Sequence, residues 1–275
     1  MPFDFALLHY EKHVKLLMML YKNLFFQKTD GLGIITLNRP EVSNTIDARL
    51  AEELGDICAQ INYNEEIRVV IITGAGQKAF SAGTDLGEIY TEINGGQELR
   101  LLSVATPVAN LRSPVIAAIN GDAIGQGLEL ALSCDLRVCL ESARFGLPHV
   151  SQGLTPWDGA TQRLPRLVGK AKAMEMILMG HLMNSSEAYR IGLVHKVVSG
   201  KEILPAATDM AQTIAAKAPL ALRYAKEALH NGLELTLEQG LRLEADLYFL
   251  LQTTEDRAEG IRAFLEKRPP RFTGN

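Results

Sequence analysis

The segment from Ser113 to Asp135 constrains this chain most, because it joins an apolar strand to a helix through a glycine-rich turn. Val115 to Ile119 form the predicted strand, and the helix carries Glu129. The turn contains Gly121, Gly125 and Gly127. Free N–H groups at a helix start suit a developing oxyanion, and a carboxylate one turn further on can move protons beside it. The segment therefore predicts an active site that polarises its substrate.

A second segment of the same kind lies upstream. Arg68 to Thr73 form a predicted strand, GAGQ forms a turn, and KAFSAGTDLGEI forms a loop that enters a helix near Asp85. Two strand-to-helix turns of this kind can converge on one carbonyl oxygen.

These two segments resemble those of the crotonase superfamily, the enoyl-CoA hydratases and isomerases, which hold a thioester oxygen with one backbone N–H from each turn. The resemblance implies Ala82, within SAGTD, and Gln126, within GQGLE, as the donors of the oxyanion hole. The family usually has glycine at the place of Gln126. Since only the N–H is needed, we expect the hole to survive, with the added side chain narrowing the space nearby.

The resemblance extends from about Tyr21 to Arg271, with further motifs in the same order: ITLNRPEVSNTID, FGLPHVSQGLTPWDGATQRLPRLVG, SSEAYRIGLVHKVV and EDRAEGIRAFLEKR. It implies an α/β fold, a crotonase-like spiral of β-β-α units with a helical C-terminal trimerisation region. We expect an N-terminal extension (1–20), a core domain (21–200) and a helical oligomerisation region (201–275). A fold-level likeness fixes a site and not a reaction.

The residue pattern predicts the same α/β order without the family. It indicates a hairpin over Leu24 to Leu37 turning at Asp30-Gly31, and a helix from about Asp47 to Asn62. Further strands are expected at Leu136 to Leu140 and Val194 to Val198. The last part reads as helices at Ile203 to Lys217, Leu220 to Asn231 and Leu235 to Lys267.

Composition excludes several protein classes. With 275 residues, 47% of them hydrophobic, and a net charge of −4, the chain can bury a sizeable core and has no general affinity for nucleic acid. The sequence contains no run of eighteen apolar residues, so no membrane-spanning helix is expected. Three cysteines without a CxxC pair favour a reducing compartment and argue against structural zinc, so we expect no metal site and a cytoplasmic protein.

The first twenty residues leave two interpretations open. Several apolar residues there could form one face of a helix that packs on a neighbour: Leu7, Leu8, Val14, Leu17, Met18 and Tyr21. Alternatively, Met18 or Met19 could be the natural start. The segment has acidic residues early and no arginine, which makes a poor targeting signal.

The groups that handle protons decide the chemistry. In the resembling hydratases two glutamates flank a bound water, one at the position of Glu129 and one at the position that His149 occupies here. A carboxylate and an imidazole can divide the general base and general acid roles, because histidine titrates near neutrality and burial raises the pKa of a glutamate. A lone histidine is more often a hydrogen-bonded core residue, but its place in the motif favours catalysis.

Asp158, beside the only tryptophan, has two interpretations. It could cap the helix that starts near Ala160, or it could hold His149 and set its tautomer. The second arrangement resembles the β-diketone hydrolase branch of the superfamily, which cleaves carbon–carbon bonds by retro-Claisen chemistry.

Substrate binding follows from the resemblance. Phe264 and Lys267, in AFLEKR, match residues that reach the adenine and 3′-phosphate of CoA, often from a neighbouring subunit; a surface lysine on an amphipathic helix is the plainer interpretation. The expected walls of the acyl pocket are Leu86, Ile89, Tyr90, Leu147 and Trp157.

The function predicted from these residues is that of an enoyl-CoA hydratase or isomerase, with Glu129 as base and His149, oriented by Asp158, as acid. No cofactor is expected to be bound permanently, since the substrate itself carries CoA. The expected assembly is a homotrimer or a dimer of trimers. Two alternatives remain: a C–C bond hydrolase acting on a β-diketone or β-keto thioester, and a catalytically silent oligomeric scaffold.

Overall fold

The computed structural model describes residues 17–85 and 102–275. Its strands form two sheets. In spatial order, the larger sheet holds β1 (Leu17–Leu20), β2 (Leu24–Thr29), β3 (Leu32–Leu37), β4 (Val69–Gly74), β6 (Val115–Ile119), β8 (Leu136–Leu140) and β11 (Lys196–Val198). The smaller sheet holds β10 (Met183–Asn184), β9 (Arg144–Gly146), β7 (Asp122–Ile124) and β5 (Ala79–Ser81).

The order of the elements produces a spiral. After β4 the chain passes to β5, after β6 to β7 and after β8 to β9, so each turn adds one strand to each sheet. Strands of successive turns pair in parallel: in the larger sheet β4 pairs with β6 and β6 with β8, and in the smaller sheet β5 pairs with β7 and β7 with β9. Helices complete these turns, as α4 does after β7. The predicted spiral of β-β-α units is confirmed.

The helices are α1 (Ala48–Tyr63), α3 (Ala105–Ala109), α4 (Gln126–Ser133), α5 (Ala160–Val168), α6 (Lys170–Met179), α7 (Ser185–Arg190), α8 (Ile203–Ala215), α9 (Pro219–Gly232), α10 (Leu237–Leu251) and α11 (Glu255–Leu265). Short 3₁₀ turns occupy η1 (Pro40–Val42), η3 (Pro148–Gln152) and η4 (Gly200–Glu202).

Local signals in the sequence explain the hairpin. Leu24 pairs with Leu37 and Thr29 with Leu32, which leaves Asp30 and Gly31 as the two-residue loop. Both loop residues have positive φ, 47° and 78°, as the turns that match strand twist require. The hairpin, the helix from near Asp47 and the strand Leu136–Leu140 are confirmed, whereas β11 starts later than expected because the Val194 N–H bonds back to the Ala188 carbonyl.

The buried core lies on both faces of the larger sheet. The main cluster joins α1 and α4 to one face, with residues such as Leu54, Ile72 and Leu130 fully buried. Helix α8 covers the other face, where Ala207 packs with Ile71. Helix α8 therefore belongs with the packed core, although the expected boundary of the helical region lies before it.

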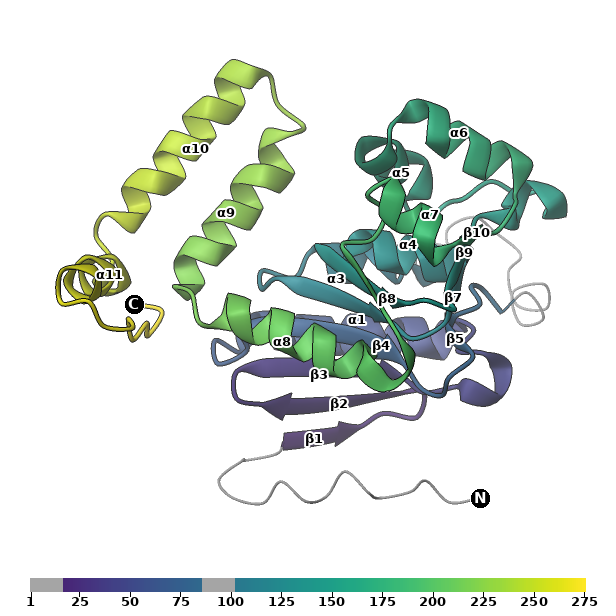
Figure 1. The fold of residues 1–275 in the computed structure, drawn as a ribbon, viewed down its shortest axis with the longest axis horizontal. Coiled ribbons are helices and arrows are strands. Elements are labelled where there is room, and N and C mark those ends of the chain that lie inside the picture. Colours follow the sequence, from purple (N-terminus) through teal and green to yellow (C-terminus); the bar gives the residue numbers. More distant parts are fainter. Residues whose placement is uncertain (1–16, 86–101) are drawn as a thin grey trace.

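The last helices extend to one side of the sheets, and α8 lies across the larger sheet (Figure 1). The single helical run expected over Leu235 to Lys267 is divided into α10 and α11, because the Thr254 side chain accepts the N–H of Arg257 and starts a new helix. Several leucines there are largely exposed: Leu229, Leu233, Leu237, Leu241, Leu250 and Leu265.

The end of the N-terminal segment is a strand, not a helix. Leu17–Leu20 pair antiparallel with β2, and Met18 lies opposite Gln27. The expected helix face therefore does not extend through Leu17 and Met18, since pairing with an edge strand satisfies their backbone groups. Leu7, Leu8 and Val14 lie outside the described residues.

Candidate active site

The two glycine-rich turns meet. Gly83, in the first turn, has φ +93°, and a Cβ there would lie 2.8 Å from the Ile124 carbonyl oxygen and 3.3 Å from the Gln126 nitrogen of the second turn. Only glycine permits this approach and this φ together. The predicted convergence of the two turns is confirmed.

The donor predicted in the first turn is wrong by two residues. The Ala82 N–H already donates to the Ser43 carbonyl at 3.0 Å, and the Gly83 N–H donates to the Ser81 hydroxyl at 3.2 Å. The next amide belongs to Thr84, and the described residues offer it no acceptor. Thr84 is therefore the residue of this turn whose N–H remains available to a substrate oxygen.

Gln126 is the residue predicted to supply the second donor. It is the first residue of α4, so no preceding turn of helix occupies its N–H. Its side chain is fully buried: Oε1 accepts the Thr84 hydroxyl at 2.9 Å, and Nε2 donates to the Leu102 carbonyl at 2.7 Å and to Asp158 at 3.1 Å.

Glu129 lies one turn further along α4 and is completely buried. Its Oε1 accepts the N–H groups of Asp158 at 2.9 Å and Ala160 at 3.0 Å. Its Oε2 has no hydrogen-bond partner among the described residues. Burial raises the pKa of Glu129 to about 7, because desolvation disfavours the charged carboxylate more than the two N–H groups favour it.

His149 faces this free oxygen. It lies in η3, only 7% exposed, with Nε2 3.8 Å from Glu129 Oε2. That separation is too long for a direct hydrogen bond. Within the described part of the chain Nδ1 also has no partner. Burial lowers the pKa of His149 because desolvation disfavours the imidazolium.

Asp158 does not orient His149, so that prediction is wrong. Its Oδ2 accepts the N–H groups of Val104 at 2.9 Å and Ala105 at 3.1 Å, and its Oδ1 accepts the Ser103 hydroxyl at 2.6 Å. No hydrogen bond or ion pair joins it to His149. The carboxylate stabilises the start of α3 instead of its own helix, whose first N–H is bound by Glu129. Sequence reasoning missed this role of Asp158, and Ser103 as its partner.

Of the five expected acyl-pocket residues, the structure describes Leu147 and Trp157. Leu147 is fully buried in the main core cluster. Trp157 is partly buried and lines a hollow of about 480 Å³ together with Ser103 and Asp158. Leu86, Ile89 and Tyr90 lie outside the described residues.

Phe264 and Lys267 do not reach the site of their own chain. Both are exposed, and Phe264 is 83% accessible. The tail after them contacts Arg68, whose guanidinium donates to the Phe272 carbonyl at 3.0 Å. Arg68 lies just before the amino end of β4, whereas the turn with Gly83 comes after the carboxyl end of the same strand. The tail and the turn therefore lie toward opposite ends of β4.

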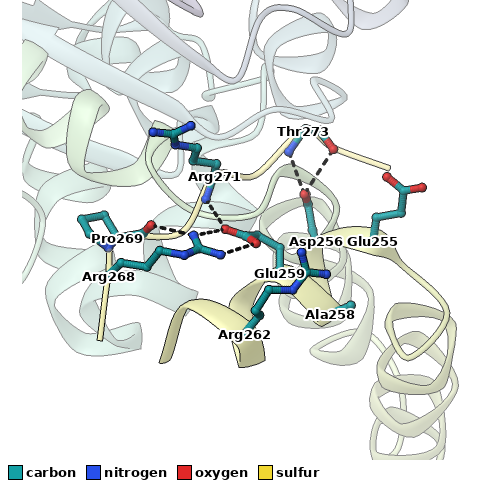
Figure 2. Close-up of a pocket in the computed structure, with 9 residues that line it drawn as sticks. All are labelled: Glu255, Asp256, Ala258, Glu259, Arg262, Arg268, Pro269, Arg271 and Thr273. Carbon is teal, nitrogen blue, oxygen red and sulfur yellow. Dashed lines mark hydrogen bonds and ion pairs between the residues drawn. The ribbon is translucent and has the colours of Figure 1, made fainter. Parts of the chain in front are cut away.

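The same tail is held against α11. Figure 2 shows Arg268 facing Glu259, with nitrogen–oxygen distances of 2.6 and 2.9 Å, and Thr273 facing Asp256, around a hollow of about 780 Å³. These contacts fix the position of the segment that carries Lys267.

Two further observations concern sites and membranes. Among residues 17–85 and 102–275, no three histidines, cysteines or acidic residues gather as a metal site would require. Across these same ranges, no helix is both long and apolar enough to cross a membrane. The cysteines Cys58, Cys134 and Cys139 are all buried free thiols.

Comparison with known proteins decides the family. Residues 27–275 match the family model described as enoyl-CoA hydratase/isomerase. The chain belongs to the enoyl-CoA hydratase/isomerase family. A crotonyl-CoA hydratase of Syntrophomonas wolfei is 38% identical over 92% of this chain and 99% of the relative. A short-chain-enoyl-CoA hydratase of Clostridium acetobutylicum is 38% identical over 90% of this chain and 95% of the relative.

Solved structures agree. The crystal structure of an enoyl-CoA hydratase from Bacillus anthracis is 42% identical, has a TM-score of 0.89, and covers 92% of this chain and 100% of its own. The chain is therefore an enzyme of the enoyl-CoA hydratase/isomerase type. The comparisons do not favour the C–C hydrolase or the scaffold, and the His149–Asp158 contact that suggested the hydrolase is absent.

Proposed function

We propose that this enzyme adds water to, or shifts, the double bond beside the carbonyl of an acyl-CoA thioester. One observation carries the proposal: Glu129 Oε2 and His149 Nε2 are buried 3.8 Å apart, one turn of helix from the amide of Gln126. The amides of Thr84 and Gln126 hold the thioester oxygen. Each such donor contributes about 3 kcal/mol of transition-state stabilisation in enzymes where it has been removed.

The pKa values indicate where the proton of the pair resides. Burial raises the pKa of Glu129 to about 7 and lowers that of His149, so a proton held by the pair resides on Glu129 in preference to His149. This exchanges the roles expected from the sequence, in which Glu129 was the base and His149 the acid. His149 takes a proton from water as the resulting hydroxide bonds to the β-carbon, and Glu129 gives a proton to the α-carbon. The sum of these steps is the addition of one water molecule.

A neighbouring subunit completes the CoA site in this proposal. Phe264 and Lys267 are exposed and lie away from their own site, and a lysine suits the 3′-phosphate as a point charge. Leu233 and Leu237 are 76% and 80% exposed, which favours burial against another copy of the chain. We therefore expect a homotrimer or a dimer of trimers. The three free thiols favour the cytoplasm.

A substrate panel tests the proposal. The purified enzyme is incubated separately with crotonyl-CoA, a 3-enoyl-CoA and a β-diketone without CoA, and the products are identified by mass. We expect a product one water heavier from crotonyl-CoA, or double-bond migration in the 3-enoyl-CoA. Cleavage of the β-diketone alone, or no reaction with any of the three, would overturn the proposal.

A further inference from the structure

A side-chain network joins the parts of the proposed site. Gln126, where the family usually has glycine, is bonded at both ends of its amide. The Thr84 hydroxyl donates to its Oε1 at 2.9 Å, and its Nε2 donates to Asp158 Oδ2 at 3.1 Å. One fully buried side chain thus spans both turns and a carboxylate from a third segment.

Asp158 connects this network to Glu129. Its side chain accepts Gln126 Nε2, while its own N–H donates to Glu129 Oε1 at 2.9 Å. The carboxylate is itself held by the start of α3 at 2.9 and 3.1 Å. A chain of hydrogen bonds therefore runs from the first turn, through the second turn, to the proton-transfer carboxylate.

We propose that the side chain of Gln126, held by Asp158, is a positioning group that fixes the amides of Thr84 and Gln126 relative to Glu129. The inference rests on the proposed function. The side chain contacts protein on both sides, so its effect passes through the two amides and not through direct contact with substrate. Small errors in such geometry are costly, since misplacement by about 1 Å can slow catalysis about a hundredfold.

Gln126→Met tests the proposal. Methionine has a similar length and keeps the backbone amide, but it makes none of the hydrogen bonds that the Gln126 side chain forms with Thr84, Leu102 and Asp158. Ser133→Ala is the matched control, because Ser133 is buried at the other end of α4 and, among the described residues, its hydroxyl bonds only the Leu130 carbonyl. We expect kcat to fall about tenfold in Gln126→Met with KM changed less than about threefold, and Ser133→Ala to match the wild type in both.

A spectroscopic measurement separates positioning from stability. The near-ultraviolet band of cinnamoyl-CoA moves to longer wavelength when a hole polarises its carbonyl. We expect saturating ligand to show at most half of the wild-type shift on Gln126→Met and the full shift on Ser133→Ala. Full shift and full kcat in Gln126→Met would overturn the inference.

A second variant keeps the test decisive if Gln126→Met does not fold. Thr84→Val replaces the hydroxyl with a methyl group and leaves the backbone amide of this residue, at a partly exposed position. It should lose part of the band shift, and an unchanged shift would overturn the inference. Failure of the proposed function is distinguishable, because then the wild type itself would neither shift the band nor turn over an acyl-CoA.

Discussion

Glu129 Oε2 and His149 Nε2 lie 3.8 Å apart in a buried site. Among the described residues, Glu129 Oε2 has no hydrogen-bond partner. A water oxygen can lie within 2.7–3.2 Å of two atoms at that separation, which is the range of a normal hydrogen bond. The pair is therefore spaced to hold one water, which the proposed function makes the reacting one. The family resemblance placed two glutamates around such a water, and here an imidazole replaces one of them.

The pair predicts a bell-shaped dependence of kcat/KM on pH. Activity should fall above about pH 7 as Glu129 loses its proton, and fall again below the usual histidine range, because the pKa of His149 is lowered and only its neutral form accepts a proton. The measurement is crotonyl-CoA hydration from pH 5 to 9. Constant kcat/KM from pH 6 to 9 would contradict this assignment.

Glu129→Gln should also change how stability depends on pH. The pKa of Glu129 is raised from 4.5 to about 7 on folding, so its contribution to stability is fully present below pH 4.5 and is lost as pH rises to about 7. That shift corresponds to roughly 3 kcal/mol. Glutamine does not titrate, so urea unfolding should show the variant gaining about this much over wild type between pH 4 and 8. An equal difference at both pH values would refute the raised pKa.

The exposed leucines predict an oligomer whose subunit contacts are weakened when one of these leucines is replaced by a charged residue. Leu237 is the first residue of α10 and 80% exposed, and an acidic residue is favourable at a helix start. Leu237→Asp should therefore fold, yet lose apolar burial of about 2 kcal/mol at each contact. Light scattering should report a trimer or hexamer for wild type and a smaller species for the variant. A monomeric wild type at micromolar concentration would remove the argument for shared sites.

Lys267→Ala should raise KM for crotonyl-CoA about tenfold and leave KM for the corresponding N-acetylcysteamine thioester unchanged, since only CoA carries the 3′-phosphate. Lys201→Ala, at another exposed lysine, is the control and should alter neither constant. Equal effects on both thioesters would show that Lys267 does not bind the nucleotide.

Local sequence signals predicted the two turns and the helix that position the candidate site. The two turns can be predicted from their own glycines and from the apolar runs before them, without knowledge of residues far away in the sequence. Glu129 can be predicted from its place on the helix that follows the second turn. The choice between Ala82 and Thr84 could not be made this way, because the Ser43 carbonyl, from a separate loop, occupies the Ala82 N–H. Asp158 was misassigned for the same reason, since its partners Ser103 and Val104 lie far upstream.

Turnover of crotonyl-CoA by Glu129→Gln tests the central claim most directly. Glutamine keeps an oxygen to accept the N–H groups of Asp158 and Ala160, so the variant should fold and bind the thioester. It cannot donate or accept the transferred proton, and loss of such a group typically costs two to four decades. We predict kcat at least ~100-fold lower with the cinnamoyl-CoA band shift retained. Hydration at the wild-type rate in this variant would contradict the assignment of Glu129 and His149 as the proton-transfer pair.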